Sequence, residues 1–167
     1  STLAAAAAPA HAASTLAGLR AIVLDGLVVF DTRRIALLAE SAFPGRGDEF
    51  ARAWRQRHFE YQWLRTCGER YADFLQVAAD SLQCTARSLD LELAAEVRTA
   101  LLDVYREPDA WPEARRALGA LKDAGLKLAI LSNMTAEMLA AGIATAGMRD
   151  VFDYVLTTDQ VRAYKPA

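Results

Sequence analysis

Two short apolar segments, each ending in polar residues, constrain the fold of this chain most strongly. Residues 21–24 (AIVL) are followed by Asp25 and a glycine, and residues 128–131 (LAIL) are followed by Ser132 and Asn133. Short apolar runs rich in branched residues are typical of buried strands in a parallel sheet. In open α/β sheets the working groups sit at the carboxyl ends of the strands. We therefore expect Asp25, Ser132 and Asn133 to lie near one another.

Helical periodicity fills the stretch between these two predicted strands. A helix is expected from about Arg33, a turn at residues 43–47 (FPGRG), and helices from Asp48 to about Glu107. Asp48 is the expected N-cap of the first long helix, and Gly68 is expected to interrupt it. A third helix is expected to start at residues 90–91. The pattern predicts an all-helical insertion after the first strand.

Strands and helices alternate in the last third of the chain. The pattern predicts a helix over 112–125, a strand over 126–131, a helix over 137–146 and a strand over 151–156. Such alternation implies right-handed crossovers and a parallel sheet. The expected fold class is therefore α/β, with an incomplete core over 18–31 and 108–167 and a helical region over 32–107.

Charge and hydropathy limit the partners and the compartment. The net charge of −2 gives no reason to expect nucleic acid or an anionic membrane surface as a partner. The sequence contains no apolar stretch of the ~20 residues that cross a bilayer. Residues 1–13 are alanine-rich and end in a pattern similar to a signal-peptidase site. The protein is exported or periplasmic if this segment is a signal-peptide remnant; if the segment is a plain tail, the protein is cytoplasmic.

The two cysteines, Cys67 and Cys84, do not have the spacing of a zinc site. They could form a disulfide in an exported protein, but we expect small buried hydrophobic residues. The sequence therefore predicts neither a metal nor a cofactor.

Asp25 is the best candidate for a nucleophile, since a carboxylate can attack carbon or phosphorus and form a covalent intermediate. The structural alternative is a helix cap. A phosphatase of this design needs a second acid two residues later, where this chain has Leu27, and residues 26–30 are almost wholly apolar. Mg²⁺ requires oxygen ligands, so a metal-assisted phosphoryl site is disfavoured. A halide leaving group needs no protonation and is compatible with an apolar loop.

Three further residue types could serve this chemistry. Arg55 could bind a substrate carboxylate or a departing anion, although most arginines are solvated surface residues. Ser132 and Asn133 could hold a carboxylate through hydroxyl and backbone N–H groups, or cap the next helix. Lys165 could hold Asp25 ionised, because a nearby opposite charge favours a charged carboxylate.

At this point the sequence resembles the L-2-haloacid dehalogenases of the haloacid dehalogenase-like superfamily. The resemblance covers about residues 20–166 and is carried by several specific stretches: 43–47 (FPGRG), 54–56 (WRQ), 60–61 (EY), 63–65 (WLR), 70–74 (RYADF), 126–133 (LKLAILSN) and 164–166 (YKP). It implies a Rossmann-like core with a helical cap, and metal-independent hydrolysis of short L-2-haloalkanoic acids to 2-hydroxy acids with inversion. The partners implied are the small 2-haloacid, a halide ion and a second subunit in a homodimer.

The resemblance also implies residue roles. Asp25 matches the nucleophile that forms an aspartyl ester, and Arg55 matches the cap arginine that receives the halide. Ser132 matches the hydroxyl that helps hold the substrate carboxylate, with Asn133 beside it. Lys165 matches the lysine that keeps the nucleophile charged. Three cap positions match residues lining the apolar substrate pocket: Gln56, Phe59 and Phe74.

The chain departs from the family pattern in three places. The loop at residues 26–29 is one residue shorter and has neither threonine nor tyrosine, and Met134 replaces a glycine. The sequence stops where the family continues with a Ser-x-Asn segment and an aspartate that activates water, so the second half-reaction has no evident base. The alternatives are a non-catalytic homologue that keeps the fold and, less favoured, a phosphatase. We also expect the 167-residue chain to self-associate, because an incomplete sheet exposes an apolar edge.

Overall fold

A parallel three-stranded sheet forms one half of the molecule. The computed structural model describes residues 18–166. Strands β1 (Ala21–Leu24), β2 (Lys127–Ser132) and β3 (Tyr154–Thr157) lie in the order β1-β2-β3, and both neighbouring pairs are parallel. The register places Leu24 opposite Ile130 and Ser132 opposite Thr157. The predicted α/β class and parallel sheet are confirmed, and the carboxyl ends of the strands share one edge.

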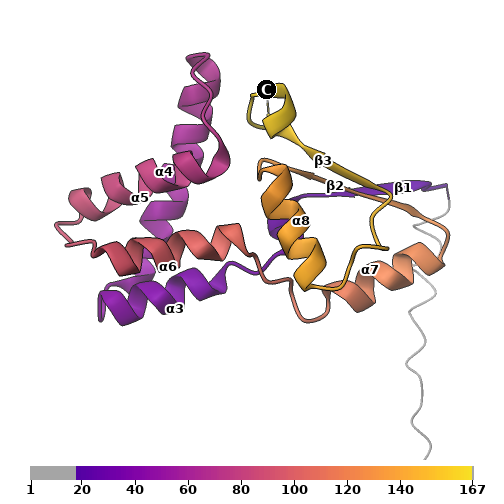
Figure 1. Ribbon diagram of the computed structural model, residues 1–167, viewed down its shortest axis with the longest axis horizontal. Helices are drawn as coiled ribbons and strands as arrows, with labels where there is room; N and C mark the ends of the chain where they lie inside the picture. Colours follow the sequence, from indigo (N-terminus) through magenta and orange to yellow (C-terminus); the bar gives the residue numbers. More distant parts are fainter. Residues whose placement is uncertain (1–17, 167) are drawn as a thin grey trace, which may run out of the picture.

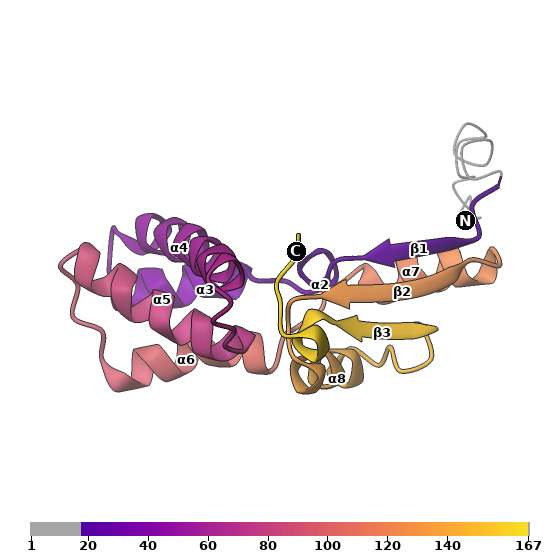
Figure 2. The same cartoon turned by 90° about the horizontal axis from the view of Figure 1, so that it is seen from above.

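Both long helices of this half lie on the same face of the sheet. Helices α7 (Ala114–Asp123) and α8 (Ala136–Thr145) lie together beneath the strands in Figure 1, and Figure 2 shows the strands in front of them from above. Leu24 shares a small hollow with Leu118 and Leu121 of α7. Its neighbour Val23 points the other way and is 60% exposed. Within residues 18–166, the face that carries Val23 has no covering element.

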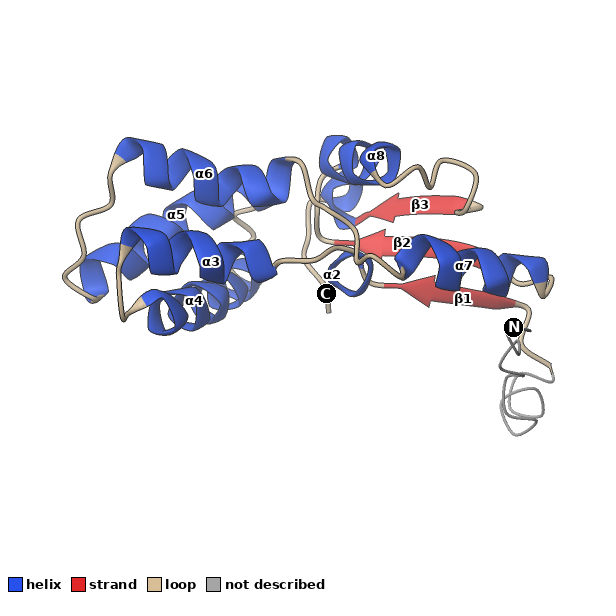
Figure 3. Ribbon diagram, turned by 90° about the horizontal axis from the view of Figure 1, so that it is seen from below, coloured by secondary structure: helices blue, strands red, loops and turns tan. Residues whose placement is uncertain are grey.

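Four helices form the other half and enclose their own core. They are α3 (Arg33–Ala42), α4 (Gly47–Cys67), α5 (Phe74–Ser88) and α6 (Ala95–Arg106), seen beside the sheet in Figure 3. Phe50, Trp54 and Leu82 are completely or almost completely buried there. The Trp54 indole N–H donates to the Ala78 carbonyl at 3.0 Å and to Ser81 Oγ at 3.1 Å, so its polar atom is satisfied inside the core.

Two antiparallel segments connect the halves. Phe30 and Ala110 form a bridge, and the Asp31 N–H donates to the Asp109 carbonyl at 2.8 Å. The predicted boundaries at residues 31/32 and 107/108 fall in or beside this crossing. Helix α8 packs closely on it at Gly142, where a Cβ would lie 2.6 Å from Phe30 Cε1. Only glycine therefore allows this approach.

Several local predictions about helix ends were wrong. Arg46, not Asp48, is the N-cap of α4, and Asp48 lies in the first turn, where a negative charge suits the helix dipole. Helix α6 begins at Ala95, because Asp90 has φ of +53° and ends the preceding turn. The expected loop after Asp25 is instead a short helix, α2 (Gly26–Val29).

Both cysteines are free thiols in the part of the chain that the structure describes. Cys67 is exposed, so the prediction of a small buried hydrophobic residue was wrong there, because Cys67 ends α4 on the surface. The predicted tail at residues 1–13 lies outside the described residues. Across residues 18–166, no helix combines the length and apolarity needed to cross a membrane.

Candidate active site

Asp25 has two structural partners at the carboxyl end of β1. Its Oδ1 accepts a hydrogen bond from the Leu27 N–H at 2.7 Å, which caps helix α2. Its Oδ2 accepts from Lys165 Nζ at 2.5 Å. The side chain is still 40% exposed. The structure therefore shows both the helix cap that was the structural alternative for Asp25 and the expected contact with Lys165.

Lys165 is held at three points. Besides Asp25, its ammonium donates to the Leu131 carbonyl at 2.7 Å, and its backbone N–H donates to Asn133 Oδ1 at 3.0 Å. Both acceptors belong to the end of β2 or the residue just beyond it. The lysine thus bridges the carboxyl ends of β1 and β2. Figure 1 shows this C-terminal segment lying between α4 and the sheet.

Ser132 lies against the residue that follows the carboxylate. A Cβ at Gly26 would lie 2.5 Å from Ser132 Oγ and 3.2 Å from Met134 Sδ. Ser132 Oγ accepts from the Met134 N–H at 3.1 Å, so its hydroxyl proton remains available to donate. The Asp-Gly pair of the sequence is therefore explained by close approach to β2.

These groups open into a cavity of about 550 Å³ between the helices and the sheet edge. Six of the predicted site residues line it: Asp25, Arg55, Phe59, Phe74, Ser132 and Asn133. Lys165 does not line the cavity itself but binds Asp25, which does. The remaining described lining is largely apolar or aromatic, with Leu27, Val28, Tyr105 and Trp111 among it. A small molecule with one anionic end and an apolar body fits such a lining.

Gln56 is the predicted residue that the structure does not bring to this cavity. Its side chain is exposed, and its amide donates to Glu60 Oε1 at 2.8 Å along the surface of α4. Consecutive residues of a helix point roughly 100° apart. Arg55 therefore faces the cavity, and Gln56, the next residue, faces away from it.

Sequence reasoning missed His58 and Gln62, which also line the cavity. Both are buried polar residues, with 5% and 1% exposure. They lie three and seven positions after Arg55 on the same helix face. That spacing is the signal that would have found them.

Burial disfavours the charged forms of two cavity side chains, His58 and Tyr105. It lowers the pKa of His58 to about 4, against a smaller opposing effect of a hydrogen bond to the Phe74 backbone. It raises the pKa of Tyr105 to about 12. The charged groups of the described lining are therefore Asp25, Arg33 and Arg55. Arg33 is already paired with Asp31 and lies over the Trp111 ring.

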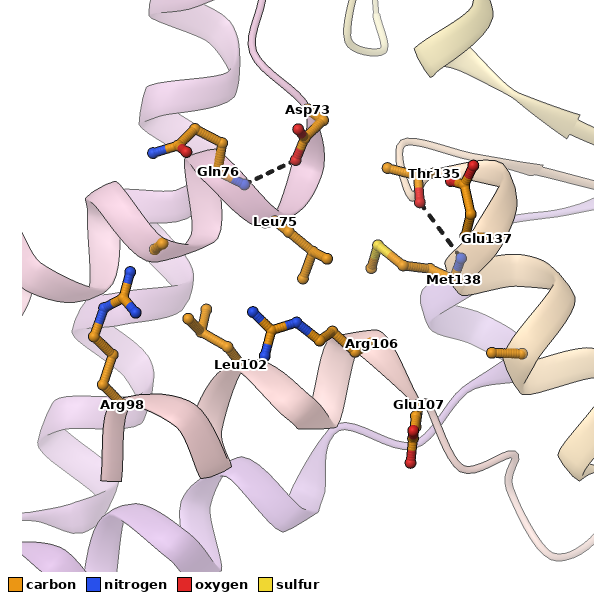
Figure 4. Close-up of a pocket in the computed structure, with 12 residues that line it drawn as sticks. Asp73, Leu75, Gln76, Arg98, Leu102, Arg106, Glu107, Thr135, Glu137 and Met138 are labelled. Carbon is orange, nitrogen blue, oxygen red and sulfur yellow. Dashed lines mark hydrogen bonds between the residues drawn. The ribbon is translucent and has the colours of Figure 1, made fainter. Parts of the chain in front are cut away.

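A second cavity, of about 640 Å³, lies between α5, α6 and the start of α8 (Figure 4). Arg98 and Arg106 line it together with acidic side chains, and Asp73 and Thr135 there cap their own helices. All eight predicted site residues are within the described chain, and none of them lines this cavity. The predicted site residues therefore gather at the cavity beside Asp25 and not at this one.

Comparison with known proteins gives consistent relatives. The chain is 43% identical to the (S)-2-haloacid dehalogenase of Pseudomonas sp. (strain YL), over 83% of this chain and 60% of that protein. It is 39% identical to the Xanthobacter autotrophicus (S)-2-haloacid dehalogenase, over 89% of this chain and 58% of that protein. The chain thus spans roughly three fifths of the length of these curated relatives.

Solved structures agree with this result. The structure of L-2-haloacid dehalogenase from Xanthobacter autotrophicus matches with a TM-score of 0.78 and 39% identity, over 89% of this chain and 60% of that one. The same enzyme with chloropropionic acid covalently bound matches with a TM-score of 0.77 and 38% identity, over the same shares. A family model described as haloacid dehalogenase-like hydrolase matches residues 12–167. The chain belongs to the haloacid dehalogenase-like hydrolase family.

Proposed function

We propose that the protein containing this chain hydrolyses short L-2-haloalkanoic acids to 2-hydroxy acids through an ester on Asp25. One observation carries the proposal: a carboxylate bound to a lysine faces the same largely apolar cavity as an arginine on α4. The names of the relatives support the same substrate class.

The first half-reaction is a displacement at carbon. An Asp25 carboxylate oxygen attacks C2 of the substrate, a C–O bond forms, and the C–halogen bond breaks with inversion. The halide leaves with its electron pair toward Arg55, whose guanidinium offers several N–H donors. The substrate carboxylate is held by the Ser132 hydroxyl and the backbone at residues 132–133, which places C2 in front of Asp25.

The lining favours a halide over an alkoxide as the leaving group. Leu27 stands where a general acid would protonate a leaving oxygen, and Val28 extends the apolar wall. Halide needs no proton. Among the described residues that line the cavity, Asp25 is the one carboxylate. These features favour carbon–halogen cleavage over phosphoryl transfer.

The second half-reaction opens the ester with water and needs a base. His58 lies in the cavity, but its pKa of about 4 makes it a weak base at neutral pH. We therefore propose that the 167-residue chain performs the alkylation step and accumulates the ester.

Incubation with (S)-2-chloropropionate tests this proposal. We expect chloride release of up to one equivalent per chain and a mass increase on the peptide that contains Asp25, read by mass spectrometry. Asp25→Asn and the (R)-enantiomer are the matched controls and should give neither. A wild-type chain that remains unmodified would favour the non-catalytic homologue. Mg²⁺-dependent turnover of an aryl phosphate would favour the phosphatase.

A further inference from the structure

Gln62 is an almost completely buried polar side chain that links the two halves of the molecule. It lies on α4 and is 1% exposed. Its Oε1 accepts from Asn133 Nδ2 at 2.9 Å, across the boundary to the sheet half. Its Nε2 lies 3.0 Å from Nε2 of His58, one turn earlier on the helix. Both ends of the amide are therefore satisfied, as burial requires.

Asn133 contacts both Gln62 and Lys165, the lysine beside the nucleophile. Because its Nδ2 is directed at Gln62, its Oδ1 is directed the other way. There it accepts from the Lys165 backbone N–H at 3.0 Å and from Thr158 Oγ1 at 3.0 Å. The Lys165 ammonium in turn lies 2.5 Å from Asp25 Oδ2. Polar contacts thus connect His58 to the Lys165 backbone, and the lysine side chain itself continues the connection to Asp25.

The Lys165 backbone N–H can only donate, so it sets the direction of the bonds in this series of contacts. Asn133 must present its oxygen to Lys165 and its NH₂ group to the Gln62 carbonyl oxygen. Gln62 must then present its own NH₂ group to His58 Nε2. A neutral imidazole has one acceptor nitrogen to receive it, and His58, whose pKa burial lowers to about 4, is neutral at pH 7. Reversing any one amide would bring two donors or two acceptors together.

The helical half also holds the residue before the lysine. The Tyr164 N–H donates to Thr66 Oγ1 at 3.1 Å, and the Tyr164 hydroxyl donates to the Ala72 carbonyl at 2.7 Å. The position of Lys165 therefore depends on α4 and the segment after it, whereas Asp25 belongs to the sheet half. Gln62 is the buried link between these two sets of contacts.

We propose that Gln62 is a positioning residue for the nucleophile: acting through Asn133, it places Lys165 so that its ammonium contacts Asp25. This inference rests on the proposed function. Gln62 forms no bond to the substrate in this role. Its loss changes the rate at which Asp25 is alkylated, and the affinity for the haloacid stays the same.

Three substitutions test the link. Gln62→Met fills a similar volume without donor or acceptor, and Gln62→Glu retains an oxygen for Asn133 Nδ2 while His58 can change tautomer to donate. Gln76→Met is the matched control, since Gln76 is also an amide on the helical half, bonded to Asp80 at the surface. Circular dichroism checks folding. If Gln62→Met does not fold, Gln62→Asn, one methylene shorter, takes its place.

Two measurements are made on each full-length variant. The first is the rate of Asp25 adduct formation as a function of (S)-2-chloropropionate concentration. The second is carbodiimide coupling of Lys165 to Asp25, which joins the two side chains in an amide with loss of water. The coupling requires contact between the two side chains. It does not depend on dehalogenase activity. The Lys127–Asp153 ion pair, in which Nζ lies 2.9 Å from Oδ1, serves as an internal standard for the coupling reaction.

We expect Gln62→Met to lower the maximal alkylation rate roughly tenfold or more, with unchanged half-saturation, because the reacting group is misplaced. We expect it to lose most of the Lys165–Asp25 coupling. Gln76→Met should stay near the wild-type values. Gln62→Glu keeps the oxygen but buries a carboxyl group, so it should lie between the wild type and Gln62→Met.

A folded Gln62→Met that couples and alkylates like the wild type overturns the inference, and so does a change confined to half-saturation. If the wild type forms no adduct but coupling still depends on Gln62, the proposed function fails and the positioning role stands.

Discussion

The helical half and the sheet half differ in how completely they bury their apolar residues. In the helical half, Trp54 and Leu82 are within about one per cent of full burial, and four helices enclose them. In the sheet half, two helices cover one face, while Val23 and Tyr154 on the other face are each 60% exposed. The helical half thus forms a closed core by itself. We expect the sheet half, which carries Asp25, to contribute less to stability.

Core truncations give the largest expected effect and test this contrast directly. Leu82→Ala removes a side chain with no exposure, so we expect a loss of about 3 kcal/mol in the free energy of unfolding. Leu156→Ala makes the same change on β3 at 44% exposure, and should cost less than about 1 kcal/mol. Urea denaturation measures both. Equal losses would contradict the comparison.

The close approach of the start of α2 to the end of β2 gives the next effect. Gly26→Ala places a Cβ 2.5 Å from Ser132 Oγ. Overpacking of this kind costs about 1–3 kcal/mol. The displaced serine should also slow alkylation of Asp25, which mass spectrometry follows.

Gly119→Ala is the matched control for this change. Gly119 lies within α7, and a Cβ there meets no atom of the described chain within 4 Å. Because alanine favours a helix over glycine, we expect a gain of about 0.5–1 kcal/mol. Destabilisation by Gly119→Ala, or none by Gly26→Ala, would show that this account of close approach is wrong.

The sequence predicted the sheet half of the site better than the helical half. Asp25, Ser132 and Asn133 follow parallel strands, and the carboxyl ends of such strands meet whatever the side chains do. Arg55 was identified by family resemblance, and its position in the cavity agrees. These placements depend on the strand pattern and on motifs that the sequence displays directly.

Helical spacing could group Gln62 with Arg55, but it could not show that this face of α4, and not the face with Gln56, is the buried one. Both glutamines lie on α4, but Gln56 is exposed and Gln62 is 1% exposed, because the docking of α4 on the sheet half decides which face is buried. The bond from Gln62 to Asn133 joins residues 71 positions apart. Helix ends were also misplaced: the positive φ of Asp90 moves the start of α6 to Ala95.

Acid should destabilise the protein through His58 on the helical half. Its folded-state pKa of about 4 lies below its ordinary value of 6.5, so between these pH values the unfolded chain binds more protons. The contribution of the neutral His58 to the free energy of unfolding is fully present above pH 6.5 and is lost as the pH falls toward 4. This single group should remove about 2 kcal/mol between pH 7 and pH 5.

His58→Gln removes this titration and should flatten the pH dependence over the same window. Urea denaturation at pH 7 and pH 5 compares the two proteins. If the wild type loses no more unfolding free energy between pH 7 and pH 5 than His58→Gln does, another group governs acid sensitivity.

The uncovered sheet face gives the smallest expected change in folding free energy and a clear change in association. The register places Val23 opposite Ala129 and Ala129 opposite Tyr154, so the exposed Val23 and Tyr154 side chains flank the buried Ala129 on this face. Such patches, and the unpaired edges of β1 and β3 within residues 18–166, favour contact with another chain. We expect light scattering to show self-association that rises with protein concentration.

Charge at this face should separate the copies without unfolding them. Val23→Lys with Leu156→Lys should give monomers, since both positions are already exposed and the charges repel at a shared interface. Leu37→Lys is the control, because Leu37 is 72% exposed on α3 of the helical half and should leave association unchanged. A monomeric wild type, or dissociation by Leu37→Lys alone, would move the interface away from the sheet. If only the Val23→Lys, Leu156→Lys variant dissociates, the exposed face of the sheet half carries the association, and the buried core of the helical half takes no part in it.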